Sequence, residues 1–144
     1  MHATVRSVIE AASDANEDVC LLDTEASPEH LSRGTAQYAD AMYAVVEPYY
    51  KSLETGRRMA LLARDLGLAR VGLIANKIRD ERDLEAVNEF GAKHGIEVAG
   101  VVPFDQHFPE AERAGVSPLD LDGDSPGVDA IGELARRLVA NERA

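Results

Sequence analysis

Residues 41–76 read AMYAVVEPYYKSLETGRRMALLARDLGLARVGLIAN, a strand pattern, a helical pattern and a second strand pattern in succession. The apolar run over 41–47 ends at Pro48, which has no N–H to donate to a sheet. Ser52 can cap a helix that runs to the stop signal Gly67, and its apolar positions are Leu53, Met59, Leu62, Ala63 and Leu66. A strand, a helix and a strand of these lengths predict a right-handed crossover in a parallel sheet.

Strand patterns continue on both sides of this unit. Residues 19–22 and residues 98–102 read as two further buried strands beside those at 41–47 and 70–76. Because strands alternate with helical patterns, the sheet should be parallel and covered on both faces. We therefore expect a three-layer α/β fold, with residues 1–144 forming a single domain.

Helical patterns fill the intervals between these strands. One covers residues 2–15, and another begins at Asp80 or Asp83 as its N-cap and runs to His94 before Gly95. A short helix is expected over 109–114. The last helix follows Ser125-Pro126, an N-cap candidate with proline in the first turn.

The composition fits this fold and narrows the choice of partners. Hydrophobic residues make up 45% of the chain and aromatic residues only 5%, so Val, Leu, Ile and Ala must build the core. The formal net charge of −11, from 15 basic and 26 acidic residues, argues against a nucleic-acid or membrane partner. Cys20 is the single cysteine, so it cannot form an internal disulfide. We expect a buried thiol in a cytoplasmic protein.

Polar side chains follow the predicted strands where each one ends. Asp23 follows the first, Glu47 the second, Asn76-Lys77 the third and Pro103-Phe104-Asp105 the fourth. The carboxyl ends of parallel strands open into the crevice where α/β proteins bind ligands. This edge of the sheet is therefore the candidate functional site.

Several blocks of sequence resemble a known family. Asp-Thr-Glu-Ala-Ser at 23–27 is similar to the Asp-x-x-Ala-Gly switch of the deviant Walker ATPases, the P-loop class of MinD, ParA and the nitrogenase iron protein. The longer blocks at 23–35, 45–55, 75–77 and 101–105 resemble the CooC-type accessory ATPases. The resemblance runs from His2 nearly to the C-terminus, and it implies a partial P-loop NTPase fold of the MinD/ParA type.

That resemblance assigns roles to individual residues. It implies ATP or ADP with magnesium as cofactors, Asp23 as the carboxylate that holds magnesium through water, and Asp23 and Glu25 as the catalytic pair. The loop ending at Ser27 would sense the terminal phosphate. The remaining nucleotide-binding positions would be Asn76, Lys77, Pro103, Phe104 and Asp105, with Asn76 and the backbone after Pro103 against the adenine. An Asn side chain can donate to and accept from a base edge at once.

The chain departs from the family pattern at several points. Ser27 stands where the switch usually has glycine, and its side chain narrows the approach of a phosphate. Asn76-Lys77-Ile78-Arg79-Asp80 resembles the Asn-Lys-x-Asp guanine signature, but Asp80 lies one residue too far along, which favours ATP over GTP. The sequence contains no Gly-x-x-x-x-Gly-Lys-Ser/Thr loop, and the Cys-x-Cys pair of CooC-type proteins, expected just before residues 2–6, is missing.

Three hypotheses follow from these patterns. The first is a partial CooC-like ATPase related to nickel insertion into carbon monoxide dehydrogenase, unable to hydrolyse ATP alone. Because the phosphate-binding loop is absent, this hypothesis expects the chain to bind nucleotide weakly or to carry no cofactor. Its partner would be a second copy, an upstream polypeptide that carries the P-loop, or a client metalloenzyme. The second is a non-catalytic interaction or dimerisation module with residues 25–33 and 49–51 as contact loops. The third is an enzyme of unrelated chemistry that uses Asp23, Glu25 and Glu47 as acid and base.

Overall fold

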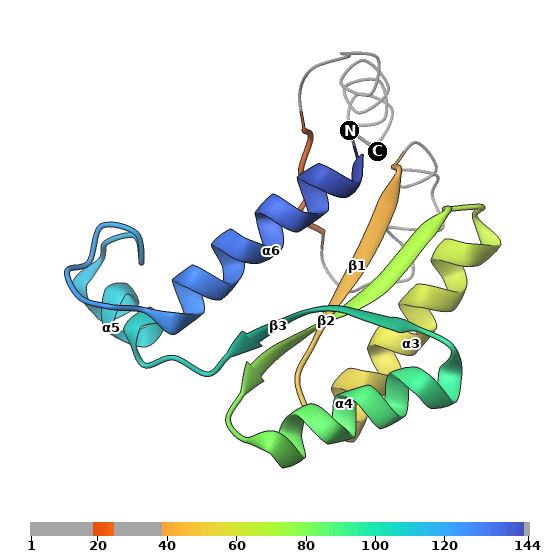
Figure 1. Cartoon of the computed structure of the whole chain (residues 1–144), viewed down its shortest axis with the longest axis horizontal. Helices are drawn as coiled ribbons and strands as arrows, with labels where there is room; N and C mark the ends of the chain where they lie inside the picture. The colour runs from red at the N-terminus through yellow and green to blue at the C-terminus, as the bar shows by residue number, and fades with distance from the viewer. Residues whose placement is uncertain (1–18, 25–38, 143–144) are drawn as a thin grey trace.

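Three parallel strands form the sheet at the centre of the molecule, in the order β1-β2-β3 (Figure 1). In this computed structural model, which describes residues 19–24 and 39–142, the strands are Ala41–Val46 (β1), Arg70–Ile78 (β2) and Glu97–Pro103 (β3). Each pair of neighbouring strands is joined by a helical crossover, as the pattern over 41–76 predicts. The predicted α/β fold with a parallel sheet is confirmed.

Helices cover both faces of this sheet (Figure 1). Leu73 of β2 is fully buried on the face packed by α3 and α4, while Gly100 of β3 lies under Leu134 of α6 on the other face. The helices are α3 (Tyr50–Asp65), α4 (Glu81–His94), α5 (His107–Ala114) and α6 (Pro126–Glu142). The three-layer arrangement is thus confirmed. Within the described ranges, no helix combines the length and the apolar character needed to cross a membrane.

Apart from α5, which begins at His107 rather than at residue 109, the helix ends follow the predicted signals with one exception. Gly95 ends α4 with a φ of 63°, and the Asp80 carboxylate caps the start of that helix by accepting the N–H of Asp83 at 3.0 Å. The exception is α3, which begins at Tyr50 rather than at Ser52. The Ser52 hydroxyl oxygen instead accepts the N–H of Glu47 at 2.9 Å, because Pro48 turns the chain straight into the helix.

The ladder between β2 and β3 is interrupted in two places. Leu73 pairs with Val98 but Ile74 pairs with Gly100, so Ala99 is an extra residue in β3. Farther along, Ala75 pairs with Val101 and Ile78 with Pro103, so here β2 holds the extra residue. An extra residue of this kind bends its strand and changes the direction of the side chains next to it.

The prediction for residues 19–22 is wrong. This segment contains no strand and does not join the sheet, and Cys20 is exposed rather than buried. A strand needs a neighbour that pairs with its backbone, and a continuously apolar one needs cover on both faces. The described residues supply no such neighbour for this segment. The helix predicted over 2–15 lies outside them.

Candidate functional site

The carboxyl ends of β2 and β3 bring four predicted site residues together: Asn76, Lys77, Pro103 and Phe104. Pro103 pairs with Ile78 in the ladder, and the N–H of Phe104 donates to the Ile78 carbonyl oxygen at 2.8 Å. This last ladder bond holds the loop after β2 against the loop after β3. With Glu47, Arg79 and Asp105 added, we call this group the strand-end cluster.

Lys77 has an unusual backbone conformation. Its φ is 57°, and it is the only non-glycine residue with positive φ in the described part of the chain. Its Nζ lies 2.8 Å from Oε1 of Glu47 at the end of β1, and its backbone N–H donates to Oδ1 of Asn76 at 3.0 Å. Because a left-handed lysine costs free energy, the surrounding contacts must hold it there.

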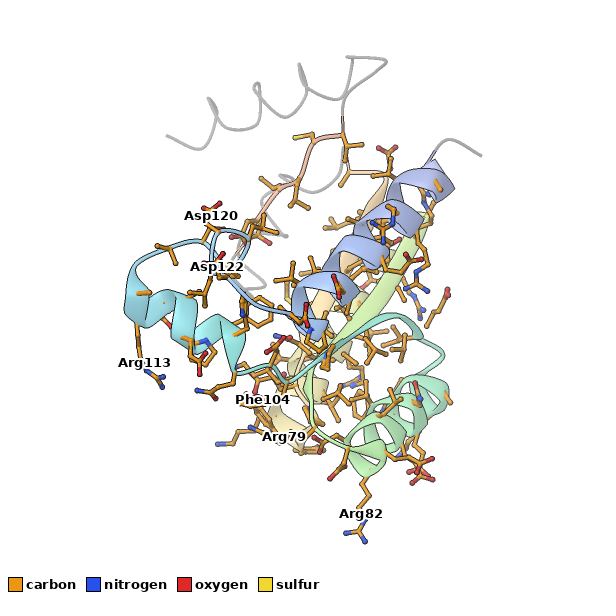
Figure 2. All side chains as sticks on the ribbon, turned by 60° about the vertical axis from the view of Figure 1, so that its left-hand side comes forward. Arg79, Arg82, Phe104, Arg113, Asp120 and Asp122 are labelled. Carbon is orange, nitrogen blue, oxygen red and sulfur yellow. The ribbon has the colours of Figure 1, made fainter. Side chains whose placement is uncertain are left out.

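Arg79 and Phe104 lie against each other in the strand-end cluster. The guanidinium carbon of Arg79 lies 4.8 Å from the Phe104 ring centroid, within the range of a cation–π contact (Figure 2). The Arg79 N–H donates to Oδ2 of Asp83 at 3.0 Å, which fixes the loop that carries it. Phe104 remains 43% exposed, so one side of its ring can receive a ligand. Sequence reasoning missed Arg79, because the strand is predicted to end at Asn76 and β2 continues to Ile78, directly before Arg79.

Asp105 uses both carboxylate oxygens within the protein. Oδ1 accepts the His107 N–H at 2.9 Å, and Oδ2 accepts the Ser125 hydroxyl at 2.7 Å and the Gly127 N–H at 2.9 Å. The His107 and Gly127 N–H groups, then the Ser125 hydroxyl, hold the pKa of the Asp105 carboxyl below its usual range. The nucleotide-binding role of Asp105 stays a prediction.

The predicted magnesium and switch residues lie in or directly after the segment 19–24. Asp23 is exposed in the segment 19–24 and does not stand at the end of a strand, because that strand is absent. Glu25 and Ser27 lie outside the described residues. No group of three or more His, Cys, Asp or Glu in the described ranges could hold a metal ion. The assignment of Asp23 as the magnesium carboxylate stays a prediction.

A cavity of about 300 Å³ lies elsewhere, beside the first residues of β2 and β3 and the end of α6. Both arginines of its lining are engaged: an Arg137 guanidinium N–H donates to the Ala99 carbonyl oxygen at 2.7 Å, and Arg70 has its own partner. Gly72 and Ala99, which have no side chain and a small one, line the cavity next to the Tyr43 ring. The cavity is separate from the strand-end cluster.

No protein-family model matches the chain. The chain is 42% identical over 107 residues to an uncharacterized ATP-binding protein of Methanocaldococcus jannaschii, covering 74% of this chain and 41% of that protein. It is 35% identical over 120 residues to the carbon monoxide dehydrogenase accessory protein CooC of Rhodospirillum rubrum, covering 83% of this chain and 45% of CooC. The chain thus spans a little under half the length of these relatives.

Solved structures show the same fold. The MinC:MinD cell division protein complex of Aquifex aeolicus matches with a TM-score of 0.76 at 22% identity, over 96% of this chain and 58% of that one. MinD of Pyrococcus horikoshii, complexed with Mg-ADP, matches with a TM-score of 0.69 at 21% identity, over 98% of this chain and 58% of that one. The chain is therefore a homologue of part of CooC and has the fold of the MinD structures, and it covers 45% of CooC and 58% of each of the two MinD chains.

Proposed function

We propose that this chain supplies the base-recognition part of a CooC-like ATP-binding domain and does not hydrolyse ATP alone. The observation that carries the proposal is the Phe104–Ile78 backbone bond of 2.8 Å, which holds the end of β3 with Phe104 against the end of β2 with Asn76. An amide beside a partly exposed aromatic ring suits a purine, which offers both hydrogen-bonding edges and a flat face.

Adenine fits this site better than guanine does. A guanine-binding site of the Asn-Lys-x-Asp type needs a carboxylate for the donors on the guanine edge. The nearest candidate, Asp80, caps α4 through the N–H of Asp83 at 3.0 Å and stands one residue too late in the sequence. ATP and ADP are therefore the nucleotides that we assign to this chain.

The chemistry of the phosphates needs groups that the 144 residues lack. The sequence has no Gly-x-x-x-x-Gly-Lys-Ser/Thr motif, so no cradle of backbone N–H groups and no Ser/Thr ligand for magnesium can be assigned. In this proposal Asp23 binds magnesium only through water, once the phosphates are held by a partner. Glu25 and Ser27 stay predictions for the phosphate-sensing switch.

Nucleotide titration of the purified chain tests this function. We expect ADP to bind measurably and more tightly than GDP, and Asn76→Ala to weaken ADP binding by roughly three- to tenfold, the range for one lost hydrogen bond. Asn88→Ala, an exposed amide on α4, is the matched control and should leave binding unchanged. Calorimetry measures the affinities. Equal affinity for ADP and GDP would refute adenine recognition.

An ATPase assay tests the second half of the proposal. The chain alone should show no magnesium-dependent turnover above background. Turnover by the pure chain that disappears in Asp23→Ala would show that the phosphate machinery is complete after all. Such a result would leave base recognition standing and overturn the dependence on a partner.

A non-catalytic interaction module is the second candidate function. Tyr49 and Tyr50, at the start of α3, are 53% and 74% exposed, as contact residues of an interface would be in the free chain. We propose a second copy, a polypeptide that carries a P-loop, or a client metalloenzyme as the partner, in the cytoplasm. Nickel insertion into a CooC-type client belongs to the same proposal. A chain that binds no nucleotide but self-associates through Tyr49 and Tyr50 would favour this function.

A further inference from the structure

We propose that Glu47 is a positioning residue for base recognition, acting on Asn76 through Lys77. The inference rests on the proposed function, because Asn76 is the residue that would meet the base. Three observations carry it: the ion pair from Glu47 to Lys77, the left-handed backbone of Lys77, and the hydrogen bond from Lys77 to the Asn76 side chain.

The orientation of the Asn76 amide depends on the backbone of Lys77. The Lys77 N–H donates to Oδ1 of Asn76 at 3.0 Å, so the amide oxygen is held and the amide nitrogen is left to face a ligand. That N–H lies in the peptide plane between Asn76 and Lys77, and because Ala75 and Ile78 are held in the ladder on either side, this plane can rotate only if ψ of Asn76 and the φ of 57° at Lys77 change together. The direction of the N–H also follows from the extra residue that β2 holds between Ala75 and Ile78. An extended Lys77 would turn its N–H elsewhere and release the amide.

Glu47 supplies the contact that holds Lys77 in this conformation. Its Oε1 lies 2.8 Å from Nζ of Lys77, with the two side chains 33% and 50% exposed. The backbone of Glu47 is itself fixed: its N–H donates to the Ser52 hydroxyl at 2.9 Å, and its carbonyl accepts the Tyr49 N–H at 2.8 Å. The first turn of α3 therefore anchors a carboxylate that reaches across to the end of β2.

The variants Glu47→Gln, Lys77→Gly and the double variant separate this role from direct binding. Glycine adopts positive φ without steric cost, so Lys77→Gly removes the ion pair and also the need for it. We expect Glu47→Gln alone to weaken ADP binding by about two- to fivefold, the range for an exposed ion pair. We expect it to have no effect in the Lys77→Gly background. Glu54→Gln, which breaks an ion pair within α3, is the matched control.

The side-chain amide signal of Asn76 in ¹⁵N-labelled protein gives a second readout without nucleotide. The signal should shift in Glu47→Gln and keep its wild-type position in Glu54→Gln. It should have the same position in Lys77→Gly as in the double variant. If Glu47→Gln weakens ADP binding equally in both backgrounds, Glu47 touches the ligand directly and the proposal is wrong. An unshifted Asn76 signal in Glu47→Gln would also overturn it. If ADP does not bind the chain at all, the proposed function fails, while the Asn76 signal still decides whether Glu47 positions that amide.

Discussion

The carboxylate of Asp105 joins the end of β3 to the first residues of both α5 and α6. It accepts from His107, Ser125 and Gly127, and the Ser125 hydroxyl oxygen in turn accepts the Val128 N–H at 3.1 Å as the cap of α6. His107 is itself buried, with Nε2 2.9 Å from the Pro118 carbonyl oxygen. One side chain thus sets where two helices start.

Asp105→Asn should lower the thermal unfolding midpoint at about pH 7, because the amide nitrogen cannot accept the hydrogen bonds that one carboxylate oxygen accepts. The folded pKa of Asp105 lies below that of the unfolded chain, near 3.9. Its stabilising contribution is therefore fully present above about pH 4 and is lost as the pH falls through the folded pKa. The difference in unfolding midpoint between the wild type and the variant should become smaller below about pH 4. Circular dichroism melts across this pH range measure it.

The control is Asp122→Asn in the exposed loop before α6 (Figure 2), which should melt like the wild type at every pH. If the difference in unfolding midpoint between the wild type and Asp105→Asn stays constant below about pH 4, the charge of Asp105 contributes nothing to stability.

At the scale of elements, α3 approaches β1 closely through Gly56. A Cβ added at Gly56 would run into Cγ1 of Val46 and come within 3.3 Å of Cδ2 of Leu73, both fully buried side chains. Gly132 of α6 is the opposite case, because a Cβ there would meet only the far end of Arg136 at 3.8 Å. Two helical glycines in one chain therefore have different reasons to be present.

Gly56→Ala should destabilise the fold by about 1–3 kcal/mol, since α3 must move away from the sheet or the core must shift. Gly132→Ala should stabilise it by about 0.5–1 kcal/mol, because alanine loses less backbone entropy in a helix. Urea unfolding gives both values. Equal effects of the two substitutions would show that helix propensity alone acts at both sites.

The same elements show what the sequence predicts well and what it does not. Helix ends at Gly67 and Gly95 are read correctly, because a left-handed glycine after an apolar stripe is a local signal. The strand predicted at 19–22 does not form, because strand pairing depends on a neighbour that is distant in sequence. The left-handed Lys77 has no local signature at all, since the ion pair that accompanies it comes from Glu47 on another strand.

At the scale of the whole molecule, part of the sheet keeps an uncovered apolar surface. Val45 of β1 is 61% exposed and points to the same face as Tyr43, while α6 packs on β3. Tyr49 and Tyr50, where α3 begins, are exposed as well. Exposed apolar side chains that gather on a surface often mark an interface.

We expect the chain to self-associate, with the sedimentation coefficient rising with concentration and with salt that screens the charge of −11. Val45→Lys should shift the protein toward monomer. Leu61→Lys, at an exposed position of α3 on the other side of the sheet, is the matched control and should not. A clean monomer at millimolar concentration would contradict the expectation.

Fold class, crossover and the location of the candidate site all follow from the order of strand and helix patterns, since parallel strands place their carboxyl ends at one edge. The contacts within the strand-end cluster do not follow from that order. Arg79 over Phe104 and Asp105 between two helices depend on loops whose paths only the packed chain determines.

The extra residue in β3 bears on how sequences of this class should be aligned. Deleting one residue from a strand normally turns every later side chain to the wrong face. Deleting Ala99 would instead leave Leu73 opposite Val98 and Ile74 opposite Gly100, the pairings already present. Leu134 would still find a glycine beneath it. A one-residue gap at Ala99 is therefore compatible with an unchanged core, and relatives can differ in length there without differing in fold.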